Sequence, residues 1–149
     1  MTSRVEVDVD ARQEPLAEAF AEPRNNPVWM EDIDRIEPLS GELGQTGSTY
    51  RIVPKRGNRV FTARVANRAW PVELKLFLDS RDVSVSITDT FHRISDTKTK
   101  LVSEEIFTFK NVLAQLGGLL GRNAIKRAHR RHMEAFKQFA ESRLPDPHR

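Results

Sequence analysis

The sequence predicts an α+β fold in which a curved, seven-stranded antiparallel sheet wraps around one long C-terminal helix. Three observations support this prediction: a long amphipathic segment near the end of the chain, stretches of alternating apolar and polar residues before it, and short turn-forming segments between those stretches. The connections between the later stretches are too short for the crossovers that parallel strands need, so antiparallel hairpins are expected.

The long amphipathic segment spans residues 121–143. Its apolar residues recur at i, i+3 and i+4 spacing, so they share one side of a helix: Ile125, Ala128, Met133, Phe136, Phe139 and Ala140. His129 and His132 fall within the same stripe, and charged residues occupy the opposite side. At about 1.5 Å per residue the helix is roughly 35 Å long, which is enough to lie along a whole sheet.

The N-terminal third predicts one strand and two short helices. Valines alternate with acidic residues over residues 3–10, which is the pattern of a strand with one exposed face. Glu14-Pro15 opens a first helix that ends before Pro23, because proline is tolerated in the first turn and disrupts a helix elsewhere. Asn25-Asn26-Pro27 opens a second helix, whose apolar residues run on to Ile33.

Six further strands are predicted by period-2 alternation and the turns between them, at residues 36–43, 48–53, 60–65, 72–79, 83–95 and 101–109. Both faces of the last strand mix apolar and acidic residues, so the sequence does not decide which face points inward. Residues 111–122 contain Gly117, Gly118 and Gly121. Each glycine costs a helix about 1 kcal/mol relative to alanine, which predicts an irregular or hinged segment able to act as a mobile lid.

Length and composition indicate a single domain over residues 1–149, with residues 145–149 as a frayed tail. The chain has no cysteine, which excludes a disulfide framework, thiol catalysis and cysteine-ligated zinc. The N-terminus lacks an apolar core of signal-peptide length, and no run of about 18 apolar residues occurs. We therefore expect a cytoplasmic protein.

Charge is distributed unevenly along the chain, although the net charge is only +3. Residues 1–42 hold 11 acidic and 4 basic side chains, whereas residues 121–149 hold 8 basic and 3 acidic ones. Mixed charges opposite an apolar stripe are typical of an ordinary exposed helix face. The basic face has no interleaved exposed aromatic residues and no recognised binding motif, so no nucleic-acid partner is predicted.

His129 and His132 are candidate functional residues, because positions three apart lie close together on a helix surface. They can serve as hydrogen-bonded core residues, as polar groups that orient a ligand, or as an acid and base. Metal ligation would need a third protein ligand, and the spacing differs from the i, i+4 pair of HExxH sites. No metal or cofactor is therefore predicted.

Asp89 is the third candidate, because it interrupts the apolar face formed by Val83, Val85, Ile87 and Phe91. A buried carboxylate is costly unless it is paired, and His129, His132 or Arg64 would be its partners. Alternatively, a bulge turns Asp89 outward. A buried Asp–His pair would raise the pKa of the imidazole and would suit an aldol or dehydration step.

The chain resembles the START-like, polyketide cyclase/dehydrase and lipid-transport superfamily (SRPBCC), which has the helix-grip fold, over roughly residues 3–144. The resemblance is carried by the element order, the proline-opened helices with Trp29 on the second, the strand entry Gly47-Ser48-Thr49-Tyr50, the segment Thr97-Lys98-Thr99-Lys100-Leu101, and the closing amphipathic helix. Members of this superfamily bind lipids, sterols, polyketides, plant hormones or quinones, and some close aromatic rings. The family has no universal catalytic signature, so the resemblance implies a fold and a cavity rather than a reaction.

The first functional expectation is therefore binding of a small hydrophobic ligand, such as a lipid, polyketide or quinone-like molecule, between sheet and helix. The alternative is a polyketide cyclase or dehydratase that uses Asp89 with His129 or His132. A third interpretation is an interaction module with a filled cavity and a basic helix that meets an acidic partner. The residues expected to line the cavity are Tyr50, Phe61, Trp70, Leu74, Leu76, Ile87, Phe91, Leu116, Leu120, His129, His132 and Phe136.

The leucines of the glycine-containing segment also suit transient membrane contact. Leu113, Leu116, Leu119 and Leu120 lie close in sequence to Arg122, Lys126 and Arg127. Apolar residues next to basic ones favour contact with a lipid surface, while core packing remains the alternative for these leucines.

Overall fold

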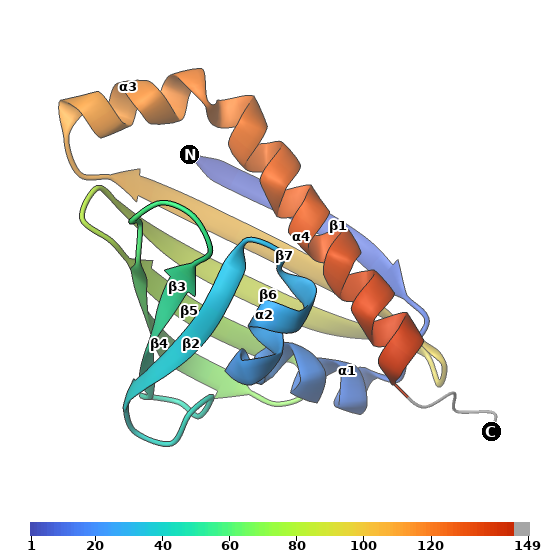
Figure 1. The fold of residues 1–149 in the computed structure, drawn as a ribbon. Coiled ribbons are helices and arrows are strands. Elements are labelled where there is room, and N and C mark those ends of the chain that lie inside the picture. The colour runs from blue at the N-terminus through green and yellow to red at the C-terminus, as the bar shows by residue number, and fades with distance from the viewer. Residues whose placement is uncertain (145–149) are drawn as a thin grey trace.

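The computed structural model describes residues 1–144, which form one curved sheet with the long C-terminal helix and the two short N-terminal helices on its inner side and a further helix at one end (Figure 1). The strands are β1 (Thr2–Val9), β2 (Ile33–Ser40), β3 (Thr49–Pro54), β4 (Phe61–Ala69), β5 (Glu73–Asp79), β6 (Val83–Ser95) and β7 (Lys98–Phe109). The helices are α1 (Gln13–Ala21), the 3₁₀ helix η1 (Pro23–Asn25), α2 (Asn26–Trp29), α3 (Val112–Leu120) and α4 (Arg122–Arg143). The predicted frayed tail, residues 145–149, lies outside the described residues.

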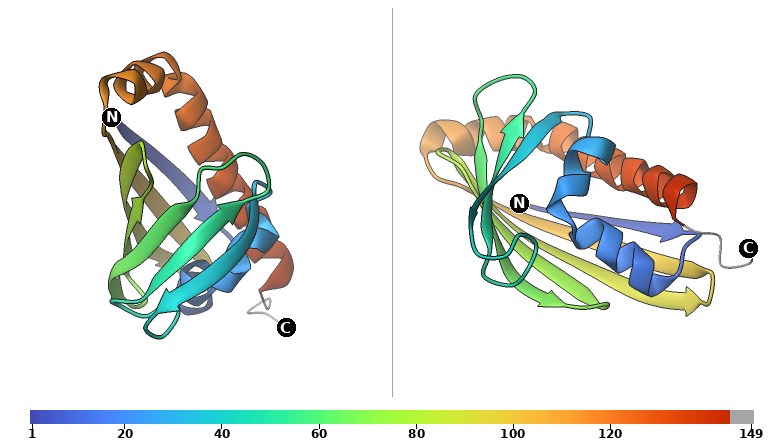
Figure 2. Two further views of the ribbon diagram at one scale, coloured as in Figure 1. Left: turned by 60° about the vertical axis from the view of Figure 1, so that its left-hand side comes forward. Right: turned by 60° about the horizontal axis from the view of Figure 1, so that its bottom comes forward.

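All seven strands belong to one sheet, in the order β1-β7-β6-β5-β4-β3-β2, and every neighbouring pair is antiparallel. Strands β1 and β2 follow one another in sequence but lie at opposite edges. The segment between them, α1, η1 and α2, therefore crosses the inner side of the sheet (Figure 2). The predicted fold class is confirmed.

The predicted boundary between the second helix and the second strand is wrong. Helix α2 ends at Trp29, and Ile33 is a buried residue of β2 opposite Pro54. The backbone carbonyl of Asp32 accepts a hydrogen bond from the Lys55 N–H, which extends the ladder between β2 and β3. The apolar residues after Pro27 have a helix-like spacing, but pairing with β3 determines their conformation.

Of the two alternatives predicted for residues 111–122, an irregular segment is wrong, whereas an interruption between two helices is present at Gly121. Helix α3 is regular, and the side chain of Asn111 caps it by accepting a hydrogen bond from the Ala114 N–H at 2.7 Å. Gly118 packs against the Phe109 ring so closely that a Cβ there would lie 2.4 Å from Phe109 Cζ. Gly118 thus permits a close contact between α3 and Phe109. The helical conformation is interrupted only at Gly121, between α3 and α4.

Helix α4 runs along the edge strand β1, and its buried residues are His129, Met133, Phe136 and Ala140 (Figure 1). Phe136 joins an aromatic cluster, with ring centroids 4.8 Å from Phe20 and 5.2 Å from Trp29. This cluster ties the C-terminal half of α4 to α1 and α2. The apolar stripe read from the sequence is thus the face of α4 that packs against the rest of the protein.

Candidate functional site

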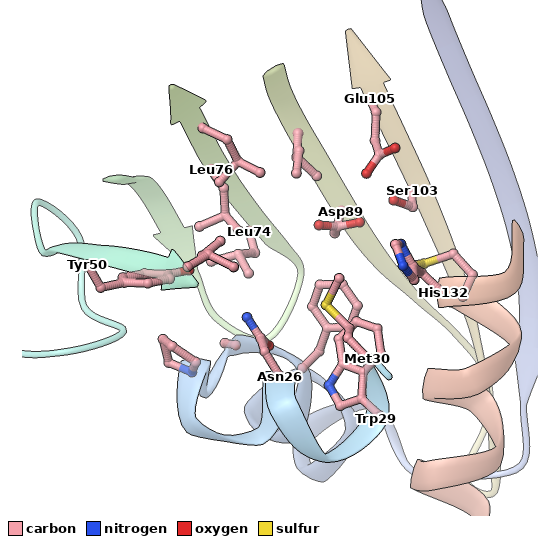
Figure 3. Close-up of a pocket in the computed structure, with 17 residues that line it drawn as sticks. Asn26, Trp29, Met30, Tyr50, Leu74, Leu76, Asp89, Ser103, Glu105 and His132 are labelled. Atoms are coloured by element: carbon pink, nitrogen blue, oxygen red, sulfur yellow. The ribbon is translucent and has the colours of Figure 1, made fainter. Parts of the chain in front are cut away.

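A cavity of about 80 Å³ lies between the inner face of the sheet and helices α1, α2 and α4 (Figure 3). Most of its wall is apolar. Four of its polar residues, Asp89, Ser103, Glu105 and His132, gather on one side, whereas Asn26 and Tyr50 lie away from them. This is well below the roughly 300–1,000 Å³ typical of pockets for drug-sized ligands, so the cavity suits a small ligand rather than a whole long-chain lipid.

Asp89 points inward from the middle of β6, where only 1% of the residue is exposed. It pairs with Ser103 on β7, and its Oδ1 has no hydrogen-bond partner. Burial raises the pKa of Asp89 to about 8, a hydrogen bond from Ser103 acts in the opposite direction, and the nearby Glu105 carboxyl adds to the rise. The Asp89 carboxyl is therefore largely protonated at neutral pH.

His129, on the buried face of α4, belongs to a chain of hydrogen bonds that leads to Asp89. Its Nδ1 lies 2.8 Å from Ser3 Oγ, and its Nε2 lies 2.9 Å from Ser103 Oγ. Burial lowers the pKa of His129 to about 4, so the ring is neutral and has one donor and one acceptor nitrogen. When Asp89 is ionised, Ser103 donates to it, so Ser103 accepts from Nε2–H and Ser3 donates to Nδ1. Ser3, His129, Ser103 and Asp89 thus form one connected path ending at the cavity.

Glu105 is a second carboxyl group on the cavity wall. Its Oε1 lies 3.6 Å from His129 Nδ1, too far for a good hydrogen bond. Burial raises the pKa of Glu105 to about 7, and the nearby His132 partly opposes the rise. The sequence did not identify Glu105, Ser103 or Ser3. Period-2 alternation places Ser103 and Glu105 on one face of β7, but only the pairing of Ser103 with Asp89 shows that this face points inward.

The two histidines have different surroundings, although their spacing places them close together on one helix surface. His132 lines the cavity, and its Nε2 lies 3.2 Å from Asp32 Oδ1, a contact that lowers the pKa of Asp32. His129 is not among the residues that line the cavity. Asp89 reaches His129 only through Ser103, so the expected direct Asp–His pair is not formed. The expected rise in imidazole pKa is wrong for His129, because burial lowers this pKa and the nearby His132 and Arg130 lower it further.

Arg64, the third expected partner of Asp89, is exposed on β4. Its guanidinium lies over the Phe77 ring, with Cζ 5.9 Å from the ring centroid. It therefore does not pair with Asp89.

Five of the residues predicted to line the cavity do so: Tyr50, Leu74, Leu76, Ile87 and His132. Burial raises the pKa of the Tyr50 phenol, because an apolar wall disfavours the charged phenolate. Of the others, Phe91 and Phe136 belong to the aromatic core, and Phe61 lies on β4 outside the cavity. Trp70 is 52% exposed beyond the end of β4, and Leu116 and Leu120 lie exposed on α3. Alternation predicts which face of a strand is apolar, but not which part of that face the helices cover.

The described residues hold no group of three or more histidine and acidic side chains placed to bind a metal ion. Within residues 1–144, no helix combines the length and apolar character needed to cross a bilayer.

No family model and no curated protein matches this sequence. The structure, by contrast, superposes on solved structures over nearly its whole length. A START superfamily protein from Mycobacterium smegmatis has a TM-score of 0.73 at 14% identity, covering 96% of both chains. The chain has a START-like fold.

Two further structures support the START-like fold. The Zhui aromatase/cyclase from Streptomyces sp. R1128 has a TM-score of 0.74 at 17% identity, covering 97% of this chain and 96% of that chain. A conserved protein from Geobacillus kaustophilus has a TM-score of 0.75 at 14% identity, covering 95% of this chain and 96% of that chain. The superpositions establish a shared START-like fold, but sequence identities this low do not establish a shared activity.

Proposed function

We propose that this START-like chain binds a small, largely apolar molecule whose one hydrogen-bonding group contacts Asp89 in the cavity. The observation that carries the proposal is the unpaired Oδ1 of Asp89 in a wall that is otherwise mostly apolar. A buried polar atom without a partner costs stability, so its presence in a cavity is explained by a partner that the ligand supplies. Apolar pockets with a few placed polar groups are the usual form of small-molecule sites.

The charges around the cavity favour an uncharged or cationic ligand. Asp89 and Glu105 both line it, whereas none of the lysines and arginines within residues 1–144 does. A protonated Asp89 donates to a carbonyl or hydroxyl oxygen, and an ionised Asp89 accepts from a hydroxyl or ammonium group. The carboxylate of a fatty acid would meet two acidic groups without a counter-ion. Among the expected ligand classes, quinone-like and polyketide carbonyls therefore fit better than fatty acids.

A matched set of one-ring probes tests this proposal. Toluene, phenol, benzylamine and benzoate have similar sizes and differ in the polar group, and amide chemical shifts in an NMR titration report their binding. We expect phenol to bind about tenfold more tightly than toluene, which corresponds to one good hydrogen bond. Benzoate is expected to bind most weakly. Equal affinities for phenol and benzoate would contradict the proposed contact with Asp89.

The variant Asp89→Leu sharpens the test because it keeps the side-chain size and removes the polar group. It is expected to bind toluene as well as the wild type does and to lose the preference for phenol. The matched control is Ser86→Leu, which makes the same kind of change on the exposed face of β6. If Asp89→Leu retains the preference for phenol, the hydrogen-bonding group of the ligand lies elsewhere.

A second candidate function is dehydration of a β-hydroxy ketone, the alternative expected from the sequence. It is favoured by the buried Asp89 carboxyl, which holds its proton near neutral pH and faces the cavity. In the step, Asp89 gives its proton to the leaving hydroxyl group, and Glu105 or His132 takes the proton from the carbon beside the ketone. The C–O bond breaks, and water and an enone form.

Dehydration of 4-hydroxy-4-phenylbutan-2-one tests this activity, because its conjugated product absorbs in the near ultraviolet. Turnover that falls about a hundredfold or more in Asp89→Asn would support acid catalysis by Asp89. A rate equal to that of buffer alone, for a compound that NMR shows to be bound, would leave binding as the function of the cavity.

A further inference from the structure

Helix α3 exposes its large apolar residues and buries only Gly118. The α3 patch, defined here as five residues, has exposed fractions of 81% for Val112, 81% for Leu113, 52% for Leu116, 65% for Leu119 and 79% for Leu120. At about 100° per residue, the five lie within an arc of roughly 120°, and Gly118 lies on the opposite side of the helix. Gly118 is the one buried residue of α3 and packs on Phe109. The helix thus turns Gly118 to the protein and its leucines to the solvent.

Basic side chains surround the α3 patch. From Ile106 to Met133 the sequence has six lysines and arginines and no acidic residue. Two more arginines, Arg59 and Arg81, come from other hairpins and line a surface cleft together with Leu113. We call Arg59, Arg81, Lys110, Arg122 and Lys126 the basic rim.

The acidic groups near the basic rim are few and already engaged. Lys110 donates to Asp79 at 2.6 Å, and Arg81 lies 3.7 Å from Asp82. The N-terminal amine adds positive charge, because it donates to the Phe107 carbonyl at this end of β7 (Figure 1). The end of the molecule that carries α3 is therefore apolar at its tip and positive around it.

We propose that the α3 patch and the basic rim dock the protein on an anionic lipid surface. The leucines enter the boundary between headgroups and acyl chains, and the basic rim contacts the lipid phosphates and carboxylates. A lipid surface fits better than a second copy of the chain, because a symmetric dimer through α3 would bring two basic rims together. The proposal is independent of the cavity ligand and can fail or succeed without it.

A single labelled cysteine tests the contact, because the natural sequence has none. Leu120→Cys places a polarity-sensitive dye in the α3 patch, and Leu39→Cys places the same dye on an exposed site of β2. Vesicles of equal parts phosphatidylcholine and phosphatidylserine are expected to blue-shift the emission at position 120 only. Vesicles of phosphatidylcholine alone are expected to give little shift, because they lack the net charge. Equal shifts at both positions, or no shift with either vesicle, would overturn the proposal.

Two pairs of substitutions separate the apolar and charged contributions in vesicle co-sedimentation. Leu119→Ser with Leu120→Ser is expected to weaken binding to the anionic vesicles by about tenfold or more. Arg122→Glu with Lys126→Glu is expected to weaken it by a similar factor and to reduce its salt dependence. The controls are Leu39→Ser and Lys98→Glu, at exposed positions outside the patch and rim.

Sedimentation velocity distinguishes the other occupants of the α3 patch. A dimer that dissociates on Leu119→Ser with Leu120→Ser would assign the leucines to a second copy and contradict docking on lipid. Tight binding to an acidic polypeptide such as poly-glutamate, with no binding to the anionic vesicles, would also contradict it. A monomer that binds only the anionic vesicles is the result we expect.

Discussion

The two ends of the molecule use apolar residues in opposite ways. At one end, α1, α2 and the C-terminal half of α4 bury Phe20, Trp29 and Phe136 in an aromatic cluster beside the cavity. At the other end, α3 leaves five large apolar side chains in solvent and packs through Gly118. The first end is built as a core, whereas the second has the composition of a contact surface.

Charge follows the same division. The acidic residues of the N-terminal third include Glu14, Glu18 and Glu22, on and just after α1. The basic rim lies next to α3: Lys110 precedes it, Arg122 follows it, and Arg59 and Arg81 line a cleft with Leu113. The difference suggests that stability and surface contact are separated along the length of α4, which joins the two ends. Substitutions at one end should therefore change stability, and substitutions at the other should change contacts with partners.

The largest expected effect comes from truncating one apolar residue at each end. Phe136→Ala removes a ring that is fully buried in the aromatic cluster, and we expect it to lower the free energy of unfolding by about 3–5 kcal/mol. Leu120→Ala, at an exposed position of α3, should change it by less than about 0.5 kcal/mol. Urea denaturation followed by circular dichroism measures both. A large loss for Leu120→Ala would mean that α3 contributes to the core and that the comparison fails.

The next effect concerns the polar side of the cavity. The pKa of Asp89 rises from 3.8 to about 8 on folding, so the folded protein binds this proton more tightly than the unfolded chain. The stability associated with that proton is complete below about pH 4 and is lost as the pH rises through about 8. Burial also raises the pKa of Glu105 from 4.5 to about 7, so this residue adds a further loss of stability as the pH rises to about 7.

Asp89→Asn should therefore be more stable than the wild type near pH 8, by an amount on the order of a few kcal/mol, and the difference should shrink towards pH 4. Parallel urea titrations across this range measure it. Ser103 keeps a hydrogen-bonding partner in this variant, so the comparison isolates the charge. A constant difference between the two proteins at all pH values would contradict a buried, protonated Asp89.

His129 should show the opposite pH dependence. Burial lowers its pKa from 6.5 to about 4, so its contribution to stability is complete above about pH 6.5 and is lost as the pH falls through about 4. Glu105, His132 and Arg130 are the charged or titratable groups that influence it. His129→Gln should cost about 1–3 kcal/mol near neutral pH, because Ser3 and Ser103 lose well-placed partners. His132→Gln, a partly exposed control, should cost less.

Much of the fold was predictable from local patterns, because strand alternation and proline-opened helices are determined by near neighbours in the sequence. The valines of β1 and the alternating residues of β6 lie in strands, as predicted. The site was less predictable, because it depends on contacts between distant segments. Ser103 and Glu105 are recognisable as residues of the site only from the pairing of β7 with β6, which places Ser103 opposite Asp89. His129 and His132 differ by about 60° around the helix, and that angle is enough to send them to different surroundings.

The smallest expected effect tests how α3 is attached. Gly117 and Gly118 are neighbours in α3, yet a Cβ at position 117 meets nothing within 4 Å, whereas one at position 118 overlaps the Phe109 ring. Gly117→Ala should stabilise the protein by up to about 1 kcal/mol, because alanine favours the helix and restricts the unfolded chain. In Gly118→Ala the same gain is opposed by displacement of Phe109, so this variant should be less stable than Gly117→Ala by about 1–2 kcal/mol. Equal stabilities would mean that α3 does not rest on Phe109, and the α3 patch would then lack the fixed orientation that docking on a surface requires.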